Sequence, residues 1–290
     1  MTFNFVGKRR IWFTISGALL ALAVGALLFN VFVRGHVMNF GIDFTGGTMV
    51  TLRFPAMVSV ADVRETLEKH GLGKSIIQRS GKQDIYIRTE EIESGLRAKI
   101  VDELKEKYGD VELLEADTIG PVIGKELRTQ ALWALFVASL GIILYVSFRF
   151  EFKYAVAALL ALYHDAIITT GIIALLWRDI EIQFIAAILT IMGYSINDSI
   201  VIFDRIRENI KKLGGKKMKL SEIINISIAE TMARSINTVL TTVIIVIAVL
   251  FFGGETLKDF ALTLLIGFVV GAYSSIFVAS PIIAVWESRK

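Results

Sequence analysis

The sequence predicts a polytopic α-helical membrane protein with six transmembrane helices and one α+β domain between the first and second helices. Hydrophobic residues make up 54% of the 290 residues, and charged residues only 20%. In soluble domains, about a quarter of all residues are charged. The apolar excess is gathered in six long runs, which is typical of membrane-spanning chains. Cysteine is absent, which excludes a disulfide framework, a thiolate metal site and a cysteine nucleophile.

Each apolar run comes close to the length that a helix needs to cross the hydrocarbon core, at about 1.5 Å per residue against about 30 Å. Barrel strands would be about half as long and would alternate in polarity. Only helices satisfy their own backbone groups in lipid. The expected spans are residues 11–33, 131–148, 154–177, 182–203, 236–252 and 260–286.

The first run follows Lys8, Arg9 and Arg10, as a signal peptide would. It is too long for the hydrophobic region of such a peptide, and its end offers no small-x-small cleavage site. We therefore expect a retained first transmembrane helix, which together with the N-terminal tail occupies residues 1–35.

Lys and Arg are concentrated in alternate loops. With the N-terminus inside, the inner segments are 1–10, 149–153, 204–235 and 287–290, and they are rich in both residues. The short outer loops are nearly free of them. The positive-inside rule therefore predicts that both termini, and a basic loop at about residues 205–234, are cytoplasmic.

Residues 36–128 are expected to form one small extracytoplasmic domain, followed by the other five helices in residues 129–290. The expected strands are 48–54, 75–78, 84–88 and 111–116, and the expected helices are 60–70 and 93–108. The order β-α-β-β-α-β is that of a ferredoxin-like domain. The segment has no Gly-rich phosphate loop, no metal cluster and no nucleophile beside a base, so we expect a docking module without a cofactor and not an enzyme.

Ionisable residues inside an apolar run cost about 2.5–3.5 kcal/mol on insertion scales, which makes them functional candidates. Asp165 lies near the middle of the third run beside His164, and Thr169 is one turn away as an expected hydrogen-bond partner. Structural and functional roles of Asp165 are equally open. Asn197 and Asp198 are adjacent and deep in the fourth run, where packing explains them poorly, so a functional role is favoured.

Two further groups of polar residues lie where the apolar runs begin or end. Arg234 precedes the fifth run and heads a stripe that includes Asn237. An ordinary basic flank explains Arg234, but an Arg that faces an Asp on a neighbouring helix is also typical of a proton relay. Asp204 and Arg205 lie at the inner boundary of the fourth span, where a structural role is favoured. The stretch 211–219 fits either an interfacial helix or a solvated loop.

Four stretches in a fixed order carry a family resemblance. The residues in them are Gly41, Asp43, Gly46 and Gly47 after the first span, His164 and Asp165, Asn197 and Asp198 with Asp204 and Arg205, and Arg234 with Asn237. Together they resemble the SecF branch of the SecD/SecF family, within the resistance-nodulation-division superfamily. The resemblance covers the whole chain, and the stretch from Gly193 to Glu208 is its most specific part.

The resemblance implies an accessory subunit of the Sec protein translocase in the cytoplasmic (inner) membrane. Such a subunit pairs with SecD and uses the proton-motive force to promote late stages of preprotein export. The implied partners are SecD, the SecYEG translocon, a YajC-like accessory subunit, the translocating preprotein and the lipid bilayer, without nucleic acid. The implied proton relay falls on Asp198 and Arg234, with Asn197 and Asp165 nearby, and needs no metal.

Two alternative interpretations compete with that of a translocase subunit. One is a half-transporter of the same superfamily that exports a small molecule or a lipid. The small outer domain disfavours it, because a ligand cavity of about 300–1,000 Å³ needs more room. The other is a structural assembly subunit without an ion path. Measurements of proton flux with and without Asp198 would distinguish it from the proton-driven translocase subunit.

Overall fold

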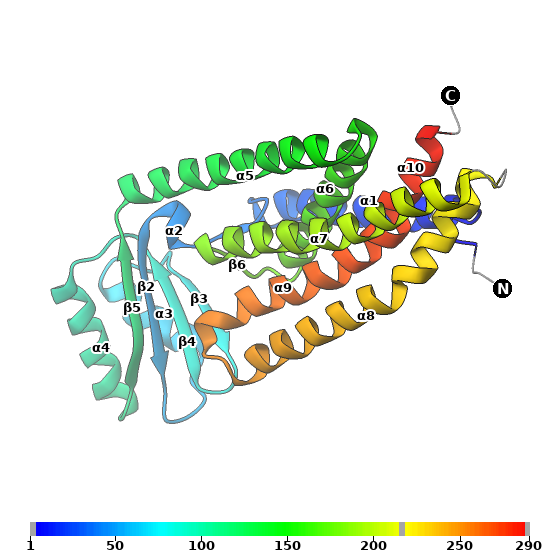
Figure 1. Ribbon diagram of the computed structural model, residues 1–290. Helices are drawn as coiled ribbons and strands as arrows, with labels where there is room; N and C mark the ends of the chain where they lie inside the picture. The colour runs from blue at the N-terminus through cyan, green and yellow to red at the C-terminus, as the bar shows by residue number, and fades with distance from the viewer. Residues whose placement is uncertain (1–3, 215–217, 288–290) are drawn as a thin grey trace. The chain divides into compact units, whose positions relative to one another are not determined.

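The computed structural model describes residues 4–214 and 218–287. The chain divides into two compact units, one of Met1–Asn39 with Trp133–Lys290 and the other of Phe40–Leu132. The first unit is a bundle of long helices, and the second contains a four-stranded sheet with two helices (Figure 1). The second unit overlaps the domain that the sequence predicts over residues 36–128.

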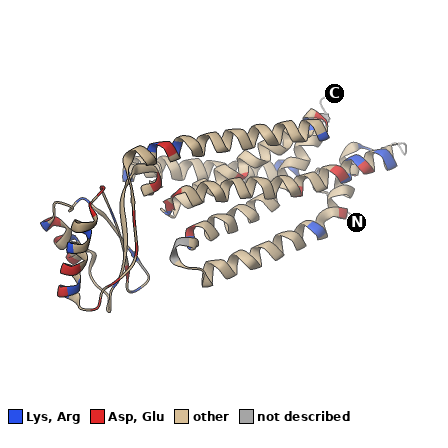
Figure 2. Cartoon of the chain, turned by 60° about the vertical axis from the view of Figure 1, so that its left-hand side comes forward, with Lys and Arg blue, Asp and Glu red and all other residues tan. Residues whose placement is uncertain are grey.

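Within residues 4–214 and 218–287, six helical segments are long and apolar enough to cross a membrane, which confirms the predicted number of spans. They are α1 (Arg9–Arg34), α5 (Pro121–Arg149), α6 (Phe152–Leu175), α7 (Ile182–Leu213), α8 (Leu220–Phe252) and the segment formed by α9 (Glu255–Ser274), the π-helical turn η2 (Ser275–Ala279) and α10 (Ser280–Glu287). Figure 2 shows long uncharged stretches along these helices, with most charged residues near the helix ends.

Helix α9 packs against α6, α7 and α8, and α1 packs against α6. Glycines permit the closest of these approaches. A Cβ atom added at Gly171 of α6 would lie 2.4 Å from the Cβ atom of Ala23, and one added at Gly267 of α9 would lie 2.1 Å from Cδ1 of Ile191. Helix α5 is joined to α6 by a hydrogen bond of 3.2 Å from the Tyr163 hydroxyl to the Ser139 hydroxyl.

The loop expected at about residues 205–234 is much shorter in the structure. Helix α7 continues to Leu213 and α8 begins at Leu220, while residues 215–217 lie outside the described residues. Ile223, Ile224 and Ile228 are buried and do not face a membrane surface. The helices continue past the apolar runs because the first turns of α8 pack against the last turns of α7.

The second unit contains the strand and helix order that the sequence predicts. Its elements are β2 (Gly47–Arg53), α3 (Val60–Lys69), β3 (Ile76–Ser80), β4 (Asp84–Thr89), α4 (Ser94–Tyr108) and β5 (Glu112–Ile119). The strands pair in the order β3-β4-β2-β5, and every pair is antiparallel. Leu52, Leu67 and Leu104, from one strand and both helices, are fully buried in a common hydrophobic core.

A short helix, α2 (Ile42–Thr45), precedes the sheet. It ends at Gly46 and Gly47, whose φ angles of 74° and 124° are those that residues with a side chain rarely adopt. A Cβ atom at Gly47 would lie 2.3 Å from the carbonyl oxygen of Thr89. Both positions therefore require glycine. Two further strands, β1 (Asn39–Phe40) and β6 (Asp179–Ile180), have two residues each.

Candidate functional site: two buried carboxylates in the helical bundle

Asp165 lies where α6, α7 and α9 meet, and its side chain is fully hydrogen-bonded. The residue is only 1% exposed. Oδ2 accepts hydrogen bonds of 2.7 Å from the hydroxyls of Ser195 and Ser274. Oδ1 lies 2.9 Å from Nδ1 of His164. Three donors from three helices therefore hold this carboxylate in one position, as buried polar groups require.

The predicted bond between Asp165 and Thr169 is wrong. The Thr169 hydroxyl is buried, and no residue in the described part of the chain forms a hydrogen bond with it. The carboxylate is turned across the helix interface toward serines of α7 and α9, and away from the next turn of its own helix. The sequence prediction considered only the neighbour along one helix, whereas the bundle supplies donors from two others.

Asp198, on α7, is also buried but only half satisfied. It is 8% exposed, and its Oδ1 accepts a hydrogen bond of 2.6 Å from the hydroxyl of Ser235 on α8. Its Oδ2 is buried and has no hydrogen-bond partner among the described residues. Tyr194 and Arg234 are the neighbouring titratable groups that interact electrostatically with Asp198. The bundle thus holds a carboxylate with one free oxygen.

Arg234 does not form an ion pair with Asp198 in the described part of the chain, and its side chain is exposed. The residue that reaches Asp198 is the next one, Ser235. Consecutive residues of a helix point about 100° apart, so Ser235 enters the α7–α8 interface while Arg234 faces outward. The sequence analysis named Arg234 in this part of α8 and did not name Ser235, which donates the hydrogen bond to Asp198.

The other predicted polar residues share the outer surface of α7 and α8. Asn197 and Asp204 on α7, and Asn237 on α8, are exposed together with Arg234. Thr190, which the sequence places on the same face of α7 as Asn197, is exposed as well. Of the four residues in the predicted relay, Asp165 and Asp198 are therefore buried, and Asn197 and Arg234 lie on the surface of the bundle.

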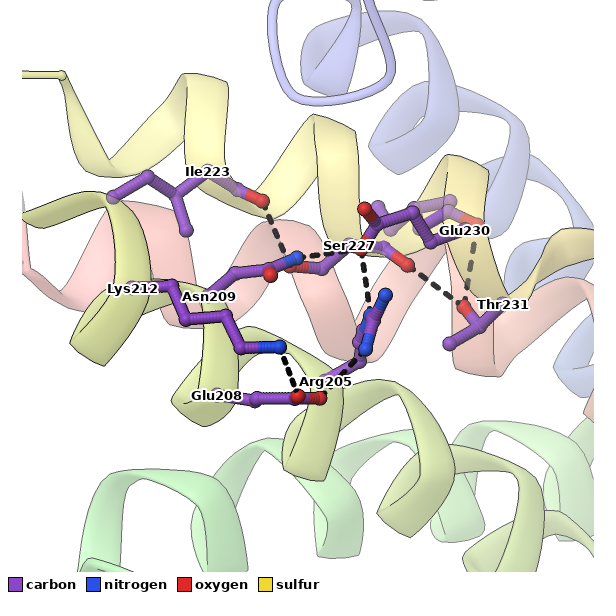
Figure 3. A network of polar contacts seen from close by, with 9 residues as sticks. Arg205, Glu208, Asn209, Lys212, Ile223, Ser227, Glu230 and Thr231 are labelled. Atoms are coloured by element: carbon purple, nitrogen blue, oxygen red, sulfur yellow. Dashed lines mark hydrogen bonds and ion pairs between the residues drawn. The ribbon is translucent and has the colours of Figure 1, made fainter.

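A second polar network joins the last turns of α7 to the first turns of α8 (Figure 3). Nε of Arg205 donates to Glu230 over 2.6 Å, and Nη1 donates to Glu208 over 2.6 Å. Nδ2 of Asn209 donates both to the Ser227 hydroxyl, 3.0 Å, and to Glu230, 2.7 Å. The bonds to Glu230 and Ser227 cross between the helices and fix the α7–α8 hairpin, whereas the Arg205–Glu208 bond lies within α7.

The neighbouring Asp204 bonds in another direction. Its carboxylate lies 3.7 Å from Nη2 of Arg149 at the end of α5. Both side chains are about half exposed, so the pair stabilises the fold only weakly. Asp204 and Arg205 therefore connect α7 to two different helices, as expected of residues with a structural role.

The remaining motif residues belong to the second unit. Gly41 is the N-cap of α2 and Asp43 lies in its first turn. The carbonyl of Phe44 in this helix accepts a hydrogen bond from Arg128. Within the described residues, no group of three or more His, Asp or Glu side chains could hold a metal ion.

These features define a polytopic membrane protein that keeps ionisable groups inside its helical bundle. Residues 99–289 match the family of the protein export membrane protein SecD/SecF, C-terminal, and residues 35–54 match the SecD/SecF GG motif. The glycines with positive φ at the end of α2 fall inside the second match. The chain belongs to the SecD/SecF family of protein export membrane proteins.

Similar proteins bear the name protein translocase subunit SecF. That of Sebaldella termitidis is 41% identical over 288 residues, which are 98% of this chain and 91% of the relative. That of Desulfurispirillum indicum is 44% identical over 285 residues, or 95% and 90% of the two chains. These names disfavour the small-molecule or lipid half-transporter.

A solved structure has the same fold. The crystal structure of SecDF from Thermus thermophilus, described as a translocon-associated membrane protein, is 41% identical and superimposes with a TM-score of 0.89 over all of this chain. The chain spans 39% of the length of that larger protein. A second SecDF structure, in a super-membrane-facing form, has a TM-score of 0.71.

Proposed function

We propose that this chain is the SecF-type half of a SecD–SecF pair that uses the proton-motive force to promote late stages of preprotein export across the cytoplasmic membrane. It acts as a non-enzymatic subunit of the Sec translocase. Its partners are SecD, the SecYEG translocon, a YajC-like accessory subunit and the translocating preprotein. Near-complete relatives that are named translocase subunits support this proposal.

The observation that carries the proposal is the half-satisfied carboxylate of Asp198. A buried carboxylate without a full set of partners is costly in a bundle that crosses lipid. Oδ2 of Asp198 has no partner, so the side chain is free to bind a proton or to accept a hydrogen bond that the isolated chain does not supply. Asp198 is the proposed proton-binding group. Arg234, Asn197 and Asp165 are the other members of the proposed proton relay.

The polar residues exposed on α7 and α8 support the proposal that a second membrane subunit packs against these helices. The amides of Asn197 and Asn237 and the charge of Arg234 are exposed within segments long enough to span the bilayer. Polar groups that face lipid tails cost several kcal/mol, of the order of 2–7 each without a partner. A second six-helix half with complementary polar groups, such as SecD, removes this cost.

We further propose a cytoplasmic position for both termini and an extracytoplasmic position for the second unit. Supporting this, the N-terminal segment lies against the first turns of α8. The backbone N–H of Val6 donates to Asn225 over 2.9 Å, so the basic N-terminus and the basic end of the α7–α8 hairpin lie at the same end of the bundle. The proposed ferredoxin-like fold of the second unit is supported by its element order and by the strand order β3-β4-β2-β5.

The test measures export of a model precursor into inverted membrane vesicles that contain this chain and its SecD-type partner. Asp198→Asn is nearly isosteric and cannot exchange a proton, so it should abolish the part of export that depends on the proton gradient and preserve the ATP-driven part. Asp259→Asn, at the rim of the bundle and paired with Arg178 at 3.4 Å, is the matched control. Full gradient stimulation in a correctly inserted Asp198→Asn protein would refute the proposal.

A further inference from the structure

Two consecutive serines, Ser274 at the end of α9 and Ser275 at the start of η2, lie between the two buried carboxylates. Ser274 and Ser275 are both 0% exposed. The Ser274 hydroxyl donates to Oδ2 of Asp165 over 2.7 Å. The Ser275 hydroxyl accepts a bond of 3.1 Å from the Ser199 hydroxyl of α7. Neighbouring residues on a helix point about 100° apart. Ser274 therefore contacts Asp165, while Ser275 contacts Ser199, the residue next to Asp198.

Ser275 has more acceptors within reach than protons to donate. Its Oγ lies 3.0 Å from the carbonyl oxygen of Gly271 and 3.4 Å from that of Ser195. It also lies beside the Asp198 carboxylate, without completing a hydrogen bond to the unpartnered Oδ2. A serine hydroxyl carries a single proton, so it donates either to a backbone carbonyl or to Asp198.

The helix departs from α geometry at this residue. The π-turn η2 begins at Ser275 and ends at Ala279, and the Ser280 hydroxyl donates to the carbonyl of Ser275 over 3.0 Å. Single π-turns inside α-helices are frequent at functional sites. One turn earlier, α9 is packed tightly on α7, since a Cβ atom at Gly271 would lie 3.2 Å from Cβ of Ser195.

We propose that Ser275 is a positioning residue that changes its hydrogen-bond acceptor with the protonation of Asp198, and that Ser274 passes this change to Asp165. When Asp198 is charged, the Ser275 hydroxyl donates to its Oδ2. When Asp198 holds a proton, the hydroxyl returns to the backbone carbonyls. This inference rests on the proposed function, because it assigns a coupling partner to the same proton-binding group.

Three titratable groups in the described part of the chain interact with the two carboxylates. Tyr194 of α7 and Arg234 of α8 interact with Asp198, and His164 of α6 contacts Asp165. None of them bonds to both carboxylates in the described part of the chain. Ser274 bonds to Asp165 and the next residue, Ser275, lies beside Asp198, which makes this pair at the α9–η2 junction the structural link between the two carboxylates.

The test uses dicyclohexylcarbodiimide, an apolar reagent that modifies protonated carboxyl groups, on vesicles that contain this chain and its SecD-type partner. The labelling rate of Asp198 is measured by mass spectrometry of its peptide. Replacing Asp165 by Asn should change this rate about fivefold or more, the lower range of coupling between two sites. In a Ser275→Ala background, the same replacement should change it by less than about twofold, the limit of independent sites.

Three further variants make the result specific to the hydroxyl. Ser275→Thr keeps a hydroxyl and should restore the coupling. Ser274→Ala breaks the link at its other end and should abolish the coupling, so it replaces Ser275→Ala if that protein fails to assemble. Thr263→Val removes a buried hydroxyl of α9 that donates to the backbone carbonyl of Asp259 in the same helix over 2.7 Å, and should leave the coupling intact.

An equal effect of Asp165→Asn with and without the Ser275 hydroxyl would overturn the inference. No effect of Asp165→Asn in either background would overturn it as well. Failure of the proposed function has a different signature, since it appears as gradient-driven export that survives Asp198→Asn. Loss of that export with unchanged coupling in Ser275→Ala would refute the switch alone.

Discussion

The two buried carboxylates differ in how completely the bundle satisfies them. Asp165 receives hydrogen bonds from Ser195 and Ser274 and contacts His164. Asp198 receives one bond, from Ser235, and keeps a free oxygen. The first lies where three helices meet, and the second lies near the exposed polar face of α7 and α8.

The difference separates a fixed group from a changeable one. A carboxylate with partners on both oxygens is held in place, and a change at Asp165 disturbs three helices. A carboxylate with one free oxygen can bind a proton or a new donor at little structural cost. We infer that Asp165 has a structural role in the bundle and that Asp198 is the carboxylate that exchanges a proton.

The largest expected effect on stability is that of Asp165→Ala. The substitution strands the hydroxyls of Ser195 and Ser274 in a dry interface, at about 1–3 kcal/mol for each unsatisfied group. Asp198→Ala strands only Ser235 and should cost about half as much. Denaturant unfolding of the purified pair in mild detergent compares the two. Equal losses would mean that the hydrogen-bond count does not distinguish the sites.

Export should depend more on the serine that bonds to Asp198 than on a serine that bonds to Asp165, which is the reverse of the order expected for stability. Ser235→Ala removes the hydrogen bond of 2.6 Å that Oδ1 of Asp198 accepts, so gradient-dependent export should fall several-fold while the free energy of unfolding drops by about 1 kcal/mol. Ser195→Ala leaves Asp165 with two other contacts and should affect export less. A larger export defect in Ser195→Ala than in Ser235→Ala would reverse the assignment of roles.

The sequence predicted the spans and both carboxylates, because hydropathy and rare intramembrane charges are strong signals. It did not predict Ser195, Ser235, Ser274 or Ser275, since serines in apolar helices carry no such signal and their partners depend on how the helices pack. For the same reason Thr169, a neighbour along the helix, was the wrong partner for Asp165. The continuation of α7 and α8 past the apolar runs also depends on interhelical bonds, such as that of Asn209 to Ser227.

The smallest expected effect is that of Thr169→Val. The Thr169 hydroxyl is buried without a hydrogen-bond partner, so replacing it by a methyl group of the same shape should be neutral or stabilising, within about 1 kcal/mol. Ser195→Ala, one helix away, removes a bond of 2.7 Å to Asp165 and should destabilise. The same unfolding experiment tests both, and a large loss in Thr169→Val would show that its hydroxyl does bond to Asp165.

The most direct test of the account is an infrared difference spectrum of the reconstituted pair between acidic and alkaline conditions, in the region where a protonated carboxyl group in an apolar environment absorbs. If Asp198 is the group that exchanges the proton, the carboxyl band should vanish in Asp198→Asn. It should persist, shifted at most, in Asp165→Asn. A band that persists in Asp198→Asn and vanishes in Asp165→Asn would contradict the account, because the fixed carboxylate would then be the one that exchanges the proton.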